Sequence, residues 1–412
     1  MRMTIEIESK VSSLLDGIAS RLDISPTKYK QAVERYTAVS SWIAEGDFEG
    51  VEDIHFYPQG SFRLGTVVRP IKNGQDADYD IDLVSEFQIS KDSMTPEDLK
   101  QIVGTRITEH EKYRKMLDEE GRRCWTLLYA EEEGVGFHLD VLPATPEEAA
   151  LRNHLIDPRI AQKAIAITHK NKNRTYDWYC SNPSGYADWF DDINKPALDI
   201  VKSVQKRNLF ETNREIYASI DEVPEALLKT PLQRAIQILK RHRDVRFINH
   251  PMALDRPISM IITTLAAKLY NGEPTVLLAL RNIVNQFDML SALLSSDYSL
   301  NKSLQTQSLI TRKDDGTWVI PNPVNPNENF ADRWHENNNQ KARAFFQWAS
   351  WVKEDIVEII GTNDVGKIVK GYETTFGEVS INAARTLGLP TSAAVISPPL
   401  VQISAPNKPW GN

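Results

Sequence analysis

The stretch FYPQGSFRLGTVVRPIKNGQDADYDIDLV, residues 56–84, places a Gly-Ser pair ahead of four aspartates that occupy every second position. Alternate side chains of an extended strand share one face, so Asp78, Asp80 and Asp82 would project together. Asp80 and Asp82 are embedded among apolar residues, where an unpaired carboxylate would cost several kcal/mol. The pattern therefore predicts a strand whose carboxylates are neutralised by bound cations.

The other two aspartates of this stretch have different interpretations. Asp76 follows Asn73-Gly74, and we expect a polar turn over residues 73–77 because Asp suits turns and water. Asp78 could belong to that turn, bind a metal ion or support a metal ligand, and these three alternatives stay open.

Divalent cations would neutralise the aspartate pair most simply. Mg²⁺ prefers oxygen ligands and is usually held by one or two carboxylates together with substrate phosphates, and Mn²⁺ suits similar ligands. Asp140 lies in a second apolar strand, FHLDVLP (137–143). Alone it could bind backbone amides, but beside Asp80 and Asp82 it would complete a two-metal site. We predict two Mg²⁺ ions at these three catalytic carboxylates.

Gly60 and Ser61 acquire a role from their position between a predicted strand and the aspartate strand. A Gly-Ser turn that starts a helix lets backbone N–H groups and the hydroxyl approach phosphates closely. We therefore expect both residues to contact the phosphates of a nucleotide.

The composition limits the class of protein. The chain has 412 residues, 41% of them hydrophobic, and its net charge of −8 gives no basic field for duplex nucleic acid. Cys124 and Cys180 form no CxxC pair, which indicates a reducing compartment and leaves too few thiols for structural zinc. The first residues lack an uninterrupted apolar stretch, and no later run approaches ~18 apolar residues. We expect a cytoplasmic protein without a membrane segment.

The periodicity of apolar residues predicts four parts. Two helices over residues 1–50 should pack on the core, short β-type runs predict a catalytic domain over 51–210, and helical segments predict an α-helical domain over 211–400. Residues 401–412, rich in Pro and Asn, predict a flexible tail. A capping-box pattern at Thr145–Glu148 predicts the start of the mainly helical part. The later helices are expected near 230–247, 257–271, 275–293, 328–361 and 363–387.

The order of Gly60-Ser61, Asp80-Ile81-Asp82 and Asp140 resembles the polymerase-β-type nucleotidyltransferase superfamily. Longer stretches look like the bacterial cGAS/DncV-like nucleotidyltransferases, the CD-NTases, over about residues 50–340: PQGSFRLGTVVRP, PLQRAIQILKRHRD, RPISMIITTLAAKLY and NPVNPNENFADRW. The resemblance implies an α+β fold with a bilobal polymerase-β-like nucleotidyltransferase core, a mixed sheet flanked by helices, and an α-helical C-terminal lobe.

The resemblance also implies an activity. Enzymes of this family join nucleoside triphosphates without a template and close the product into a cyclic di- or trinucleotide, a second messenger of anti-phage (CBASS) defence. ATP and GTP are the expected substrates, with a pyrimidine nucleotide as an alternative. The product would act on a separate effector protein, and a regulatory protein could bind the C-terminal tail.

The family's site residues carry over onto matching positions. Gly60 and Ser61 match the turn that grips phosphate, Asp80 and Asp82 match the carboxylates that touch both metals, and Asp140 matches the acid that helps activate the attacking ribose hydroxyl.

Two further residues come from the resemblance. Lys240, in ILKRHR, matches a lysine that contacts the triphosphate, and Ser259, in PISMIITT, matches a serine with a similar role. Lys240 would sit at the edge of an apolar helix face, so its stem could cross a cleft between the lobes. Ser259 follows Pro257 in the first turn of an apolar helix, where free N–H groups favour phosphate.

Some features depart from the family or leave alternatives. The linker at 67–77 is longer than in the animal relatives, and no zinc-ribbon set of Cys and His is present, which argues against activation by duplex DNA. The element at 322–329 resembles one in the oligoadenylate-synthase branch, yet turn chemistry alone would explain it. Two other functions compete: a single nucleotidyl transfer to a protein, RNA or small-molecule acceptor, and a catalytically silent nucleotide-binding module.

Overall fold

The computed structural model describes residues 5–68, 71–72, 75–76, 78–132, 135–147, 156–290 and 309–391. The expected tail at 401–412 lies outside the described residues. Of the expected polar turn at 73–77, only residues 75–76 are described, and they form a short strand.

The chain forms the following strands: β1 (Ile54–Gln59), β2 (Ile71–Lys72), β3 (Gln75–Asp76), β4 (Tyr79–Phe87), β5 (Trp125–Glu132), β6 (Val135–Pro146), β7 (Ile165–Lys170), β8 (Tyr176–Ser181), β9 (Thr311–Arg312), β10 (Trp318–Val319), β11 (Pro321–Asn322) and β12 (Asn325–Asn329). It forms the following helices: α1 (Ile5–Leu22), α2 (Pro26–Ala44), α3 (Gly60–Arg63), α4 (Pro96–Glu109), α5 (Glu111–Met116), α6 (Pro158–Ala161), α7 (Pro183–Thr212), η2 (Ile220–Glu222), η3 (Glu225–Leu227), α8 (Pro231–Arg246), η4 (Ala253–Asp255), α9 (Ser259–Leu269), α10 (Val276–Leu290), α12 (Glu336–Val352), η6 (Lys353–Val357), η7 (Glu358–Thr362), α13 (Val365–Phe376) and α14 (Glu378–Thr386).

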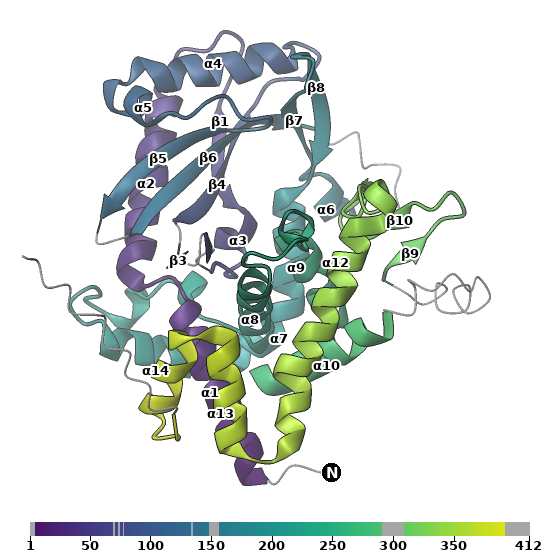
Figure 1. Ribbon diagram of the computed structural model, residues 1–412. Coiled ribbons are helices and arrows are strands. Elements are labelled where there is room, and N and C mark those ends of the chain that lie inside the picture. Colours follow the sequence, from purple (N-terminus) through teal and green to yellow (C-terminus); the bar gives the residue numbers. More distant parts are fainter. Residues whose placement is uncertain are drawn as a thin grey trace, which may run out of the picture.

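The main sheet is mixed, as predicted. Its strand order is β1-β4-β6-β7-β8, and β5 pairs with β6. The strands β4 and β6 run parallel, whereas the other neighbours are antiparallel. The sheet and the helices below it form the two lobes seen in Figure 1.

The helical part begins later than the capping-box pattern predicts. Thr145 and Pro146 end β6, where they pair with Ala166 and Ile165 of β7. The pairing continues into β8, and the long helix α7 follows only at Pro183. Tertiary pairing of an apolar strand has therefore overridden a local helix-start signal.

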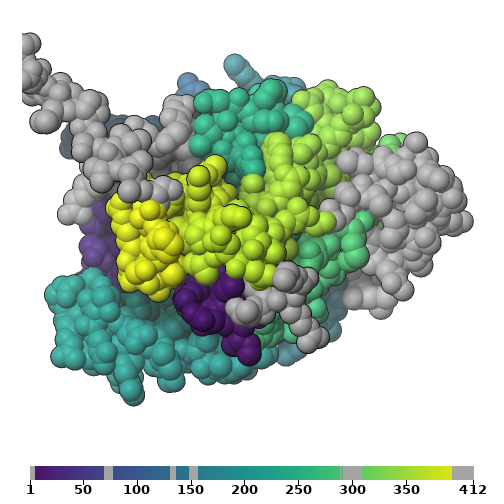
Figure 2. All heavy atoms as spheres, turned by 60° about the horizontal axis from the view of Figure 1, so that its bottom comes forward, coloured from purple at the N-terminus to yellow at the C-terminus, as the bar shows by residue number. Residues whose placement is uncertain are grey.

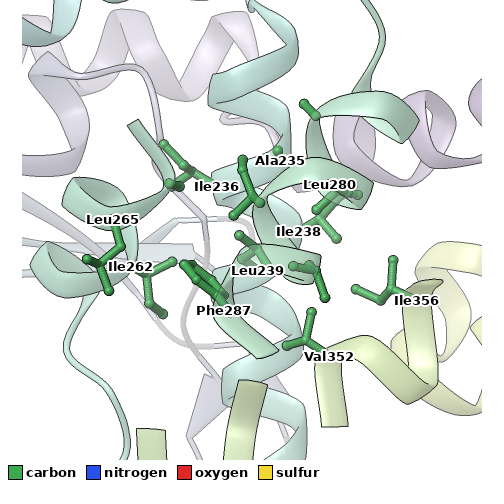
Figure 3. Packing of buried hydrophobic residues seen from close by; sticks show 14 of the residues in the cluster. Ala235, Ile236, Ile238, Leu239, Ile262, Leu265, Leu280, Phe287, Val352 and Ile356 are labelled. Carbon is green, nitrogen blue, oxygen red and sulfur yellow. The ribbon is translucent and has the colours of Figure 1, made fainter. Parts of the chain in front are cut away.

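Two hydrophobic cores hold the lobes. In the first, α2 and α4 pack on the apolar side chains of β4, β5 and β6. In the second, α1, α8, α9, α10, α12 and α13 pack on one another, and Figure 3 shows aliphatic and aromatic side chains of several of these helices meeting around α8.

The two N-terminal helices divide between these cores. The buried side chains of α1 belong to the helical core, and α1 contacts α14 and α13 near the other end of the described chain. Figure 2 shows the purple N-terminal segment directly beside the yellow C-terminal helices. The buried side chains of α2 belong instead to the core beneath the sheet. Residues 5–44 therefore connect the two lobes.

The expected helices at 230–247, 257–271 and 275–293 are present as α8, α9 and α10. The segment expected to be helical from 328 instead begins as the end of β12, and the residues Asn337, Asn338 and Asn339 have left-handed backbone before the regular part of α12. Gly377 divides the segment at 363–387 into α13 and α14. No described helix has the length and apolar character that a membrane crossing requires.

Substitution of two isoleucines, one buried and one exposed, tests whether the helical core stabilises the fold. Ile238 of α8 is fully buried, whereas the Ile200 side chain of α7 is 76% exposed. We expect Ile238→Ala to lower the free energy of unfolding by about 2–5 kcal/mol, because it leaves a cavity. Ile200→Ala makes the same chemical change in a helix and should cost less than about 0.5 kcal/mol. Urea denaturation measures both, and similar losses in the two variants would contradict the assignment of this core.

Candidate active site

The site is built where β1, β4 and β6 lie side by side. Gln59 of β1 is the register partner of Asp82 in β4, and Asp82 is the register partner of Asp140 in the parallel strand β6. Gly60 directly follows Gln59, so strand pairing alone brings the Gly-Ser turn and two of the three predicted carboxylates together.

Gly60 requires the absence of a side chain. Its φ of 61° lies in the left-handed region, and a Cβ atom there would stand 2.3 Å from Oδ2 of Asp82. The backbone of the turn therefore approaches the carboxylate more closely than any other residue would allow. The turn continues as predicted into a helix, the single-turn α3.

Asp82 is a buried carboxyl group that lies beside two other carboxylates. Burial raises the pKa of Asp82 to about 7, and the neighbouring carboxylates of Asp140 and Asp80 act in the same direction. Lys240 opposes this shift. A cation between these carboxylates would remove the conflict, so the donor set fits the oxygen ligands that Mg²⁺ prefers.

Asp80 and Asp78 both face His138 of the adjacent strand. The Asp80 side chain is 62% exposed, and its Oδ1 lies 3.3 Å from Nδ1 of His138. Asp78 accepts a hydrogen bond of 2.8 Å from the Gly136 N–H and lies 3.4 Å from Nε2 of His138. Asp78 thus holds the start of β6 and lines neither of the cavities described below. In the described part of the chain, no three Cys, His or acidic side chains are already arranged as a metal cage.

Asp140 is oriented by a hydroxyl that the sequence did not single out. Thr126 of β5 is its antiparallel register partner and donates a hydrogen bond of 2.5 Å to Oδ1 of Asp140. The contact occupies one carboxylate oxygen and fixes the direction of the group. Only strand pairing could have identified Thr126, since 14 residues separate it from Asp140.

A cavity of about 700 Å³, which we call the lysine cavity, opens between the sheet and the helices α8 and α9. All seven residues that the sequence nominated line it: Gly60, Ser61, Asp80, Asp82, Asp140, Lys240 and Ser259. Residues from distant parts of the chain thus meet around one space between the two lobes.

Lys240 reaches across the boundary between the lobes. It is buried, and its Nζ donates hydrogen bonds of 3.1 Å to the carbonyl and to the hydroxyl of Thr66, in the loop after α3. Burial lowers the pKa of Lys240 to about 7, with Arg243 acting in the same direction and Asp82 in the opposite one. A bound polyanion would favour the charged ammonium at this position.

Ser259 lies in the first turn of α9, as predicted, but the helix begins at Ser259 itself, so that Pro257 precedes it instead of occupying its first position. Its Oγ accepts a hydrogen bond of 3.0 Å from Nη1 of Arg243, which also donates to the Pro257 carbonyl at 3.0 Å. Arg243 was missed, although it lies three residues after Lys240 and hence near it on the helix surface. It adds a guanidinium group to the wall of the lysine cavity, where it is ion-paired with the neighbouring Asp244.

A second cavity of about 340 Å³, which we call the glutamate cavity, adjoins the first. The two share lining residues that include Gly60, Asp82 and Asp140. The glutamate cavity is also lined by Asn322 and Glu328, at the ribbon of β11 and β12, and by apolar and aromatic side chains that include Leu142, Ile167, Tyr186, Met260 and Phe330. The carboxylates therefore stand where two spaces of different character meet.

Comparison with known proteins identifies relatives of this chain. The family model described as "Cyclic GMP-AMP synthase DncV-like, nucleotidyltransferase domain" matches residues 54–143. A c-di-GMP synthase of Roseivirga ehrenbergii is 30% identical over 336 residues, which cover 81% of this chain and 76% of that protein. The cyclic dinucleotide synthase CdnG of Bradyrhizobium diazoefficiens is 25% identical over 344 residues, 80% of this chain and 72% of that protein.

A solved structure has a similar fold. The structure of the Bradyrhizobium diazoefficiens CD-NTase CdnG in complex with GTP superimposes with a TM-score of 0.64 at 22% identity, and the match covers 92% of this chain and 99% of that one. The mixed sheet with its flanking and C-terminal helices is thus the polymerase-β-like architecture that the sequence predicted.

The raised pKa of Asp82 predicts how stability depends on pH in metal-free protein. Because the folded state holds this proton more tightly than the unfolded chain, the contribution of Asp82 to stability is full below pH 3.8 and is lost as pH rises through about 7. The free energy of unfolding of Asp82→Asn should therefore fall less over this range than that of the parent protein. Urea denaturation at several pH values measures the difference.

Magnesium provides the control for that experiment. At pH 7.5, Mg²⁺ should stabilise the parent protein by mass action and stabilise Asp82→Asn much less. Parallel pH curves for the two proteins, or equal stabilisation by Mg²⁺, would contradict the role given to Asp82.

The hydrogen bond from Thr126 can be removed with little change of shape. Thr126→Val deletes the hydroxyl, and we expect kcat to fall about 10- to 100-fold, the usual effect of losing a partner that orients a metal-binding or catalytic group. Thr126→Ser keeps the hydroxyl and should retain most of the activity, and KM should change little in either variant. Equal losses in the two variants would show that packing, not the hydrogen bond, matters at this position.

Proposed function

We propose that this chain, a nucleotidyltransferase that belongs to the DncV-like family, synthesises a cyclic di- or trinucleotide from nucleoside triphosphates. One observation supports the proposal most strongly: all seven nominated residues line the lysine cavity, which adjoins a second space at the carboxylates. The two adjoining spaces together give room for the triphosphate of the attacked nucleotide, for its base and sugar, and for the hydroxyl that attacks it.

The lysine cavity would receive the triphosphate. Lys240 and Arg243 supply positive charge, and Ser259 opens α9, where unpaired N–H groups and the helix dipole favour anions. Gly60 lets the backbone of the turn approach the phosphates closely, and Ser61 follows it in the same wall. The bound triphosphate would raise the pKa of Lys240 and so favour its charged form.

The three carboxylates would hold two Mg²⁺ ions, with Mn²⁺ as an alternative. Such ions stabilise the leaving pyrophosphate and lower the pKa of the attacking hydroxyl. Asp82 and Asp140 already lie opposite one another, and Asp80 would turn from His138 to join them. Asp140, oriented by Thr126, would accept the proton of the ribose hydroxyl as the oxygen attacks the α-phosphorus and pyrophosphate departs.

Ring closure would repeat the same transfer on the linear product. The free hydroxyl at one end would attack the α-phosphorus at the other, in the same site and with the same residues. The names of the relatives support this outcome, since one is a c-di-GMP synthase and another a cyclic dinucleotide synthase. The CdnG structure with GTP supports nucleoside triphosphates as substrates.

The biological part of the proposal follows from the family. The product would be a second messenger in anti-phage defence, made in the cytoplasm and read by a separate effector protein. A regulatory protein could bind the C-terminal tail, which lies outside the described residues.

The decisive experiment incubates purified protein with all four nucleoside triphosphates and Mg²⁺. We expect release of pyrophosphate and a phosphatase-resistant cyclic product, identified by mass spectrometry. The double variant Asp80→Asn/Asp82→Asn should reduce the activity more than about 100-fold. Loss of a residue that only orients a metal ligand typically costs about 10- to 100-fold, and this variant removes two of the proposed ligands themselves. The exposed residue Asp92 offers a matched control, because Asp92→Asn leaves both cavities intact.

Other outcomes would favour other functions. If labelled nucleoside triphosphates are used and the label is found only on a protein or an RNA, the result would favour a single nucleotidyl transfer. Nucleotide binding without any release of pyrophosphate, unchanged in the double variant, would favour a catalytically silent module.

A further inference from the structure

Glu328, near the end of β12, has a carboxylate that a hydrogen bond from Asn322 of β11 orients. Asn322 is buried, its Nδ2 donates a hydrogen bond of 2.8 Å to Oε2 of Glu328, and its Oδ1 accepts one of 3.0 Å from the Val324 N–H. Both polar ends of Asn322 are therefore used, and Glu328 keeps one orientation. The two residues line the glutamate cavity together.

The other asparagines of this element maintain the ribbon itself. Asn329 accepts hydrogen bonds from the N–H groups of Ile320 and Ala331 and donates to the Trp318 carbonyl. Asn325 donates to the Cys180 carbonyl at 3.3 Å, which ties the ribbon to the end of β8. Turn chemistry thus accounts for the asparagines but not for Glu328, whose only hydrogen bond among the described residues comes from Asn322.

The lining of the glutamate cavity indicates which end of a nucleotide it can take. Arg63, which is ion-paired with Asp191, and Arg123 line this cavity too. Most of its wall is nevertheless apolar or aromatic, and the carboxylate of Glu328 repels phosphate. The side chains of Tyr186 and Phe330 offer aromatic surface in the wall beside Glu328. The glutamate cavity therefore suits the base and sugar of a nucleotide whose phosphates point toward the carboxylates.

A carboxylate can only accept hydrogen bonds, and this limits the base that it binds. Guanine presents two neighbouring donors, N1–H and N2–H, that match the two oxygens of a carboxylate. Adenine and cytosine place an acceptor nitrogen at the corresponding position, and uracil places its single N–H between two carbonyl oxygens. Guanine alone among the four bases offers a bidentate match.

We infer that Glu328, positioned by Asn322, is a specificity-determining residue that selects guanine by accepting hydrogen bonds from its N1–H and N2–H. The inference rests on the proposed function, because it takes the glutamate cavity as the place of the nucleoside. It adds the identity of the base and the side chain that recognises it.

The test compares GTP, ATP and ITP as substrates of the full chain and of Glu328→Gln. Hypoxanthine, the base of ITP, keeps N1–H but lacks the 2-amino group, so kcat/KM of the parent should be highest for GTP, lower for ITP and lowest for ATP. Glutamine has nearly the same shape, but it presents one acceptor and one donor, which match N6–H and N1 of adenine. We expect Glu328→Gln to lower kcat/KM for GTP about 10- to 100-fold and to raise it for ATP.

A glutamate outside both cavities provides the matched control. Glu336 pairs with Arg333 on the surface and lines neither cavity, so Glu336→Gln should keep the parent's order of substrates. Equal use of GTP and ITP by the parent, or an unchanged GTP-to-ATP ratio in Glu328→Gln, would overturn the inference while pyrophosphate release still supported the proposed function.

If neither the parent nor the variant releases pyrophosphate, recognition of guanine can still be tested separately from catalysis. Calorimetry with Mg²⁺ would then measure the binding of non-hydrolysable analogues of GTP and ATP. Preference of the parent for the GTP analogue, lost in Glu328→Gln, would then support guanine recognition without catalysis. Equal affinity for the two analogues would overturn the recognition as well.

Discussion

Repulsion between Asp82 and Asp140 is the constraint on which the rest of the structure depends. Parallel pairing of β4 with β6 sets these carboxylates opposite one another, and burial raises the energy of the ionised pair further. The surrounding elements accommodate these two carboxylates. Gly60 has no Cβ atom that would collide with Asp82, Thr126 donates a hydrogen bond to Asp140, and Lys240 places an amino group of the other lobe nearby. A proton on Asp82 or a bound cation would relieve this repulsion.

The helical lobe contributes cations where the sheet contributes anions. Lys240 and Arg243 lie on α8, whose opposite side is packed into the helical core, so their positions are as rigid as that core (Figure 3). Arg243, in the last turn of α8, connects this helix to the start of α9 by donating hydrogen bonds to Ser259 and to the Pro257 carbonyl. A triphosphate would thus meet groups that are already placed, which lowers the entropy that binding must offset.

The sequence was sufficient for the parts of the site that follow from local patterns. Carboxylates inside apolar strands identified Asp80, Asp82 and Asp140, and a proline identified the start of α9 before Ser259. Lys240 and Ser259 needed the family resemblance, because an edge lysine and a helix-start serine are ordinary features. Thr126 and Glu328 were beyond reach, since strand register and the fold of a ribbon decide where they lie. The strands β7 and β8 were missed because their pairing is a tertiary effect.

The contact between α1 and α14 has a consequence for folding during synthesis of the chain. Arg21 donates a hydrogen bond to the Asn382 carbonyl across 361 positions of sequence. At roughly 5–20 residues per second of synthesis, α1 would wait on the order of 20–70 s for this partner. The apolar face of α1 also packs on α8 and α10, which are made earlier, so this face is covered in stages during translation and fully only once α13 and α14 have been made.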